Sequence, residues 1–96
     1  MIKKYRKKPL IVDAVKYTGK NIEEIKKFAY DNSEQDVKQR SKVIHYGEGD
    51  NQNFYIKTLE GAMIVNPNDW IIKGTKGEFY ACKDFIFKDI YEEMKE

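Results

Sequence analysis

Two patterns of hydrophobic and polar positions divide the chain. Residues 22–30, IEEIKKFAY, repeat apolar side chains at helical spacing, so that Ile22, Ile25, Phe28 and Ala29 share one face and the charged residues turn away from it. An amphipathic helix of this kind is stable when its apolar stripe packs on another element. The pattern therefore predicts a helix that covers a sheet.

Capping signals place the start of this helix. Asn21 is an N-cap residue type, and Glu24, three positions later, completes a capping-box pattern. Gly19 ends the preceding segment, residues 9–17, whose β-branched content and leading proline are typical of a strand. We therefore predict a strand over residues 9–17 and the main helix over residues 21–30.

The second half of the chain consists of short strand-like runs separated by tight turns. The runs are KVIHYG, NFYIKTL, AMIV, WIIKG and GEFYAC, and the turns fall at Glu60-Gly61, at the Pro67-Asn68-Asp69 corner and at Thr75-Lys76. Within NFYIKTL, Phe54, Ile56 and Thr58 alternate with Tyr55, Lys57 and Leu59, which gives one face for the core and one mixed face. Strands joined in this way form antiparallel hairpins in sequence order.

The fold class that follows is α+β: a bent antiparallel sheet or small barrel-like β-roll of five to seven strands, with one main helix packed on it. The tail, residues 84–94, predicts a helical turn followed by a closing strand. Residues 31–41 are almost entirely polar and predict a surface connection. At 96 residues the chain is expected to form a single domain, residues 1–96.

Charge separates the first residues from the rest. Residues 1–8 hold five Lys or Arg and no acid, which leaves 13 basic and 16 acidic residues elsewhere, so a basic N-terminal arm precedes a mildly acidic body. The segment MIKKYRKK lacks the apolar core of a secretion signal, and no later apolar run approaches the roughly 20 residues that span a bilayer. We expect a cytoplasmic protein of the host cell, without a membrane partner.

Several tandem motifs resemble one known family. The segments YRKKPLIVDAVKYTG, NIEEIKKF, TLEGAMIVNPNDWIIKGTKGEFYACK and the closing IF and YEE are similar to short, uncharacterised proteins encoded by phages and prophages. The match leaves out residues 31–53, and the chain departs from the family pattern at Asn68, where the family has Gly, and at Asp84, where it has Pro. Asn tolerates a positive φ, so the first turn can survive. The resemblance implies a viral accessory gene product and no particular activity.

The chemical inventory gives little support to catalysis. One His and one Cys, with no ligand-spaced pair, predict no metal site, and the common nucleotide-binding glycine motifs are absent from the sequence. Cys82 and His45 are a conceivable thiolate and base, but Cys82 lies in an aromatic strand, where a small buried hydrophobe is the commoner role. We expect no catalytic residues and no cofactor.

The corner after residue 65 and the hairpin that follows it supply the candidate ligand or partner surface: Asp69, Trp70, Lys73, Lys76, Glu78, Tyr80 and Lys83. The structural alternative is a well-made sheet corner, in which Asp69 caps the turn, Trp70 begins a strand and packs in the core, and Glu78 pairs with Lys73 or Lys76. The three lysines either solvate strand edges or hold a small anion.

The basic arm is a candidate nucleic-acid contact through Lys3, Lys4, Tyr5, Arg6, Lys7 and Lys8. Its alternative is internal, because from Asp84 to the end there are five acids and two lysines, and paired terminal strands would place opposite charges together. The chain also has seven tyrosines, of which some are expected to be exposed and to favour a protein partner or self-association.

These observations lead to one main functional hypothesis and two alternatives. The chain is expected to be a non-enzymatic accessory protein of a phage or prophage that binds a host macromolecule, a host protein above all, through its sheet or its corner. The alternatives are nucleic-acid binding by the basic arm and sequestration of a small anionic or nucleotide ligand at the hairpin lysines. A homo-oligomer is compatible with each.

Overall fold

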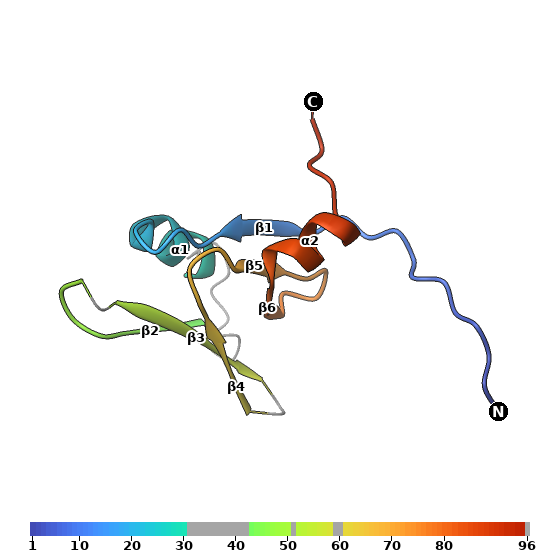
Figure 1. The fold of residues 1–96 in the computed structure, drawn as a ribbon, viewed down its shortest axis with the longest axis horizontal. Helices are drawn as coiled ribbons and strands as arrows, with labels where there is room; N and C mark the ends of the chain where they lie inside the picture. Colours follow the sequence, from blue (N-terminus) through green and yellow to red (C-terminus); the bar gives the residue numbers. More distant parts are fainter. Residues whose placement is uncertain (31–42, 51, 59–60, 96) are drawn as a thin grey trace.

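The computed structural model describes residues 1–30, 43–50, 52–58 and 61–95, and the residues between these ranges and at the end lie outside the description. The described elements follow in the order β1 (Asp13–Lys16), α1 (Ile22–Ala29), β2 (Val43–Tyr46), β3 (Asn53–Thr58), β4 (Gly61–Val65), β5 (Trp70–Lys73), β6 (Phe79–Cys82) and α2 (Asp84–Ile90). The six described strands form two three-stranded antiparallel sheets (Figure 1). The fold is therefore α+β, as predicted, without a closed barrel.

The first sheet has the order β1, β5, β6 and joins the N-terminal part of the chain to its C-terminal hairpin. Its register pairs Val15 with Ile71 and Ile71 with Ala81. The β5–β6 hairpin closes where the Gly74 N–H donates to the Glu78 carbonyl at 2.7 Å. Gly77 has a φ of 81°, a conformation that favours glycine, so the tight turn predicted around residues 74–77 is confirmed.

The second sheet has the order β2, β3, β4, a meander of neighbouring strands. Its register pairs Val43 with Ile56 and Phe54 with Val65, so these side chains share one face. Gly61, predicted to form a two-residue turn with Glu60, belongs instead to β4 and pairs with Thr58. Residues 59 and 60 lie outside the description.

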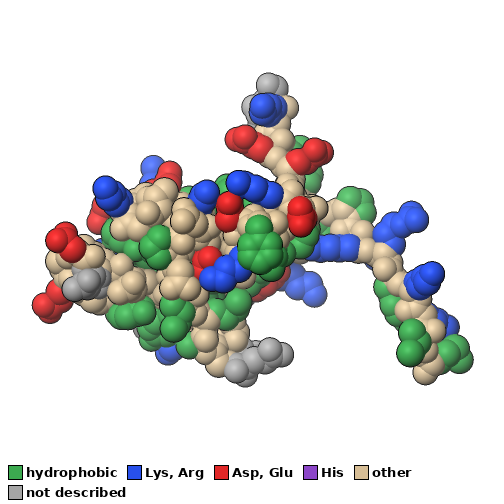
Figure 2. Space-filling model, in the orientation of Figure 1, with side chains coloured by type: hydrophobic (Ala, Val, Ile, Leu, Met, Phe, Trp, Pro, Cys, Tyr) green, Lys and Arg blue, Asp and Glu red, His purple; other side chains and the backbone are tan. Residues whose placement is uncertain are grey.

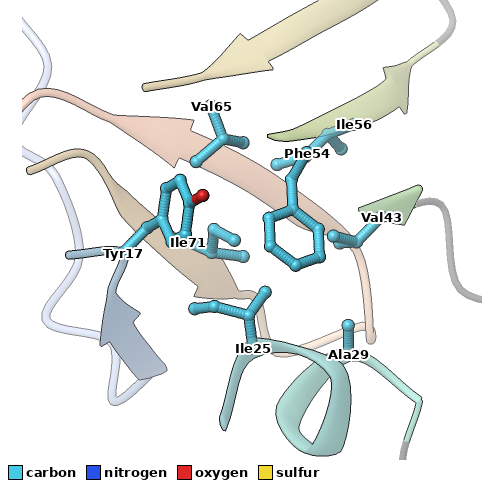
Figure 3. Close-up of a cluster of buried hydrophobic side chains, with 8 residues drawn as sticks. All are labelled: Tyr17, Ile25, Ala29, Val43, Phe54, Ile56, Val65 and Ile71. Carbon is cyan, nitrogen blue, oxygen red and sulfur yellow. The ribbon is translucent and has the colours of Figure 1, made fainter. Parts of the chain in front are cut away.

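The core lies between the two sheets and is closed by α1 (Figure 3). Phe54 and Ile56 point into it from β3, as the alternation in NFYIKTL predicts, and Ile25 and Ala29 enter it from α1. The Tyr17 ring meets the Phe54 ring edge to face at a centroid distance of 5.3 Å. The buried cluster comprises Tyr17, Ile25, Ala29, Val43, Phe54, Ile56, Val65 and Ile71. The apolar face of α1 therefore packs into the core, as its helical spacing predicts.

The start of α1 differs in detail from the predicted capping box. The Asn21 carbonyl oxygen Oδ1 accepts a hydrogen bond from the Thr18 N–H at 2.8 Å, outside the helix. The Asn21 amide nitrogen donates to Glu24 Oε1 at 2.6 Å, which joins the two side chains to each other and not to helix backbone N–H groups. The predicted contact between the Asn21 and Glu24 side chains is therefore present. The Asn21 Oδ1 atom, however, binds the loop before the helix and does not cap the helix itself.

The second helix covers the other face of the first sheet. Strand alternation places Trp70 and Ile72 on the face opposite to Ile71, and Ile72 is fully buried there. Phe87 of α2 stacks on Trp70 with a centroid distance of 4.0 Å and an interplanar angle of 8°. The central strand β5 is consequently buried on both faces at Ile71 and Ile72, and α2 packs on the face opposite to the core through Trp70.

Three details of the prediction need correction. The strand predicted over residues 9–17 is limited to Asp13–Lys16, because β5 offers it partners only there. The tail forms the helix α2 but no closing strand among the described residues, since the chain after α2 runs away from the two sheets (Figure 1). Trp70 begins β5, as predicted, but packs under α2 and lies outside the central core cluster. The connection predicted over residues 31–41 falls outside the described residues.

Neither described helix has the length and apolar character needed to cross a membrane.

Candidate functional site

The Asp69 carboxylate organises the corner between β4 and β5. Asp69 is 4% exposed, and its Oδ2 accepts the Asn66 N–H at 2.9 Å, which is the turn-capping role predicted for it. Its Oδ1 lies 3.2 Å from Lys83 Nζ, so the buried charge has a partner. Both carboxylate oxygens of Asp69 therefore make contacts that stabilise the corner.

Backbone hydrogen bonds tie this corner to the end of β1. The Tyr17 N–H donates to the Asp69 carbonyl at 2.9 Å, and the Asn68 N–H donates to the Tyr17 carbonyl at 2.6 Å. Asn68 has a φ of 78°, a left-handed conformation that Asn tolerates better than most residues. The corner is thus a continuation of the β1–β5 ladder, which holds Asp69 and Lys83 in place.

The Asp84 carboxylate is a second centre of contacts that the sequence did not reveal. Its Oδ1 accepts the Trp70 indole N–H at 2.8 Å, and Lys88 and Lys16 approach the carboxylate at 3.0 and 3.5 Å. The indole and Lys88 hydrogen bonds, in that order, hold the pKa of Asp84 below its ordinary value of 3.8. Asp84 thereby fastens the first turn of α2 to β5 and β1.

A row of aromatic rings continues along α2. Phe87 lies between Trp70 and Tyr91, with a centroid distance of 4.9 Å to Tyr91. The hydroxyl groups of Tyr91 and Tyr80 are 3.2 Å apart. Burial, and then the hydrogen bond with Tyr91, raises the pKa of Tyr80 to about 12. Tyr80 therefore stays protonated at neutral pH and supports the packing of α2 on the first sheet.

The remaining candidates of this surface lie at the other end of the hairpin. Lys73 pairs with Phe79 in the register and Trp70 with Cys82, so Lys73, Lys76 and Glu78 flank the turn while Lys83 lies at the corner. Glu78 Oε2 accepts the Lys76 backbone N–H at 3.0 Å, a contact within the turn. The structure thus brings Asp69, Trp70 and Lys83 together, but the three hairpin lysines do not converge on one anion.

The basic arm extends away from the body of the protein (Figure 1). Met1, Ile2 and Tyr5 are almost fully exposed, and Lys7 Nζ alone of these positions approaches the body, 3.5 Å from the Tyr91 hydroxyl and 5.0 Å from its ring centroid. The strand pairing between the two terminal segments, expected as the internal alternative, is not formed in the described part of the chain. The arm cations are consequently open to a partner.

Cys82 and His45 do not form a catalytic pair. Cys82 belongs to the first sheet and His45 to the second. The His45 Nε2 atom is 2.7 Å from Gln52 Oε1, and its ring packs on Phe54. Burial raises the pKa of the Cys82 thiol, which keeps it protonated and weakly nucleophilic. Among the residues described, no three His, Cys, Asp or Glu side chains are grouped to hold a metal ion.

One surface was missed by the sequence analysis: the outer face of the second sheet. The register pairs Ile44 with Tyr55 and Tyr55 with Ile64, and strand alternation turns all three away from the core. The exposed fraction is 61% for Ile64 and 41% for Tyr46, whose ring lies 5.6 Å from that of Tyr55. The signal was present in NFYIKTL, where the mixed face carries a tyrosine and a leucine beside one lysine.

Comparison with protein-family models, curated proteins and solved structures gave no match to this chain.

Proposed function

We propose that this chain is a non-enzymatic binding module that holds a host macromolecule, above all a host protein, against the outer face of its second sheet. The observation that carries the proposal is the contrast in burial between the two sheets. Ile71 and Ile72 are fully buried on the two faces of the first sheet, whereas on the outer face of the second sheet Tyr46 and Ile64 are exposed and Ile44 and Tyr55 are half-buried. A surface of this composition gains free energy when a partner removes it from water.

The chemistry of this outer face suits a protein partner. Tyrosines are enriched where proteins bind each other, because a rigid ring gives a large contact area at low entropic cost. Here two neighbouring tyrosines, Tyr46 and Tyr55, lie beside the aliphatic Ile44 and Ile64, with Lys57 next to them in β3. A face with few charges and an aromatic centre favours burial against an apolar protein surface over phosphate binding.

A phage or prophage origin is part of the proposal and rests on the motif resemblance. The two departures from the family pattern are compatible with the local geometry. Asn68 has the positive φ that a glycine would accept, and Asp84 is the first residue of α2, a position where proline is also favoured. Accessory products of such genes commonly act by binding host components, which agrees with a module that lacks a converging nucleophile, acid and base among its described residues.

Two alternatives remain as proposals of lower rank. Nucleic-acid binding is supported by the open cations of the basic arm and by Tyr5, which is 88% exposed. Phosphate binding gives no role, however, to the exposed apolar side chains of the arm. Sequestration of a small anion loses its main support, because Lys83 is paired with Asp69 at the far end of the hairpin from Lys73 and Lys76.

The proposal is tested by a tagged pull-down from host lysate after nuclease treatment, followed by binding measurements with the purified partner. Tyr46→Lys combined with Ile64→Lys is expected to weaken binding at least tenfold, because it places two charges at the centre of the apolar face. The matched control is Thr75→Lys, which adds a positive charge at an exposed position of the turn between β5 and β6.

The expected result is a nuclease-resistant protein partner that the control binds as the wild type does. A partner retained with unchanged affinity by the double variant would contradict the assignment of the outer face. Recovery of nucleic acid alone, lost on nuclease treatment, would move the basic arm to first place.

A further inference from the structure

The exposed large apolar side chains gather at the two ends of the chain. Most of those that the structure describes belong either to the N-terminal segment, residues 1–11, or to the C-terminal segment, residues 85–95. The first group is Met1, Ile2, Tyr5, Leu10 and Ile11, and the second is Phe85, Ile86, Ile90 and Met94. Soluble proteins rarely leave so much apolar surface together without a partner that covers it.

The two segments carry opposite charge. The N-terminal segment holds five Lys or Arg and no acid, and the C-terminal segment holds Asp89, Glu92 and Glu93 beside Lys88 and Lys95, a net charge of −1. Lys88 in the same stretch is already paired with Asp84 at 3.0 Å. Figure 2 shows the consequence: blue and green side chains alternate along the arm, and red side chains surround the base of the tail. The segments are therefore complementary in both charge and apolar content.

Within one chain this complementarity is hardly used. The segments meet where Lys7 reaches Tyr91, and beyond that point the arm and the tail run in different directions (Figure 1). The chain has a radius of gyration of 14.6 Å, against ~12.5 Å for a compact domain of this length. Its accessible surface of 8302 Å² exceeds the roughly 5,800 Å² of a compact monomer of 11.4 kDa.

We propose that two copies of this chain associate by exchanging these segments, so that the N-terminal segment of each copy lies along the C-terminal segment of the other. A two-fold arrangement of this kind forms the same contact between complementary segments twice. No unpaired segment is then left to bind a third copy. It buries Ile2, Tyr5 and Leu10 against Phe85, Ile90 and Met94, and it pairs the arm cations with Asp89, Glu92 and Glu93. Neither segment has this opportunity inside one molecule.

A second copy explains more of the surface than a nucleic acid does. Phosphates would occupy the arm cations, but they would leave the apolar side chains of both segments in water. The acids close to Tyr91 would also repel the phosphate backbone beside Lys7. A second copy satisfies the cations, the acids and the apolar side chains together. This inference concerns the chain ends and is independent of the proposed role of the second sheet.

The test is sedimentation velocity of nuclease-treated protein at low and moderate salt, with two charge-reversed variants. The arm-reversed variant carries Lys3→Glu, Lys4→Glu and Arg6→Glu, and the tail-reversed variant carries Asp89→Lys, Glu92→Lys and Glu93→Lys. The wild type is expected to dimerise, more weakly as salt rises. Each variant alone is expected to dimerise at least tenfold more weakly. An equimolar mixture should recover a dimer of mixed composition, because both exchanged contacts again join opposite charges.

The control reverses two exposed lysines elsewhere, Lys20→Glu with Lys27→Glu, and should dimerise as the wild type does. Dissociation of this control would attribute the effect to net charge and overturn the proposal. A monomeric wild type at ~100 μM, far above the Kd range of a specific interface of standard size, would also overturn it. Binding of nucleic acid by a monomeric wild type and by the tail-reversed variant, but not by the arm-reversed variant, would assign the arm to nucleic acid. Failure of the mixed variants to form a dimer would exclude the exchange.

Discussion

The two sheets of this protein share one core but differ in what lies on their other face. The first sheet packs Ile71 into the core and Ile72 against α2, and both side chains are fully buried. The second sheet packs Phe54 and Ile56 into the core and leaves Ile64 and Tyr46 in solvent. Both sheets are three-stranded and antiparallel, so local strand chemistry does not distinguish them. The difference separates the faces that contribute to stability from the face whose described side chains stay in water.

The position of α2 causes this difference. The helix has no fully buried residue of its own, yet Phe87 stacks on Trp70 and Asp84 binds the Trp70 indole, which fixes it over the first sheet. The second sheet receives α1 on its core side through Ile25 and Ala29. Each of the two described helices covers one face, and among the described residues Tyr46 and Ile64 on the outer face of the second sheet stay exposed.

The largest expected effect separates the two faces of β3. Phe54→Ala removes a fully buried ring and should lower the free energy of unfolding by about 3–5 kcal/mol, or abolish cooperative unfolding altogether. Tyr55→Ala, on the outer face of the same strand, should cost about 1 kcal/mol or less. Urea unfolding followed by circular dichroism measures both values. Similar losses for the two variants would mean that the outer face is buried.

The next effect compares the far faces of the two sheets. Ile72→Ala leaves a cavity between β5 and α2 and should cost about 2–5 kcal/mol, whereas Ile64→Ala on β4 should change stability by about 0.5 kcal/mol or less. The two substitutions remove the same atoms, so differential scanning calorimetry of the pair reports burial directly. If Ile72→Ala were no more destabilising than Ile64→Ala, α2 would not cover the first sheet.

The smallest expected effect depends on pH and concerns the attachment of α2. Because the folded-state pKa of Asp84 lies below its ordinary value of 3.8, the ionised carboxylate stabilises the fold. Its contribution is fully present above pH 3.8 and is lost as the pH falls through the lower, folded-state pKa. Asp84→Asn should therefore be less stable than the wild type at pH 6, and the two should converge below pH 3.8.

The matched control for this pH effect is Asp50→Asn, because Asp50 is exposed and lies outside both helices. It should show little difference from the wild type across the range. A stability difference between Asp84→Asn and the wild type that stayed constant down to the acid limit would mean that the carboxylate charge is not what holds α2. Thermal unfolding at a series of pH values provides the measurement.

The sequence was a good guide wherever a feature depends on near neighbours. The helix over α1, the strands β2 to β6 within a residue or two and the turn-capping role of Asp69 follow from spacing, β-branched content and turn chemistry over a few positions. The positive φ of Asn68 also follows from local chemistry. Such features are fixed by sterics and hydrogen bonds that operate within a turn or a strand.

The features that the sequence did not predict involve partners far apart in the chain. Asp84 binds Trp70, 14 positions away, and Lys16 at the opposite end of the first sheet. Pairing of the terminal segments was expected from their charges, but the arm meets the tail through Lys7 and Tyr91 and then diverges. A residue pattern identifies the groups that need partners, but the choice among several partners depends on the packing of all elements at once.

By itself, the sequence determined the class of fold, the elements and the faces of the strands that point inward, because side-chain alternation and helical spacing act locally. The tertiary structure alone decided that the strands divide into two sheets, that α2 covers the first, and that Tyr46 and Ile64 remain exposed on the second. The physical reason is that every strand offers two faces, and which of them stays in water depends on which distant element reaches it.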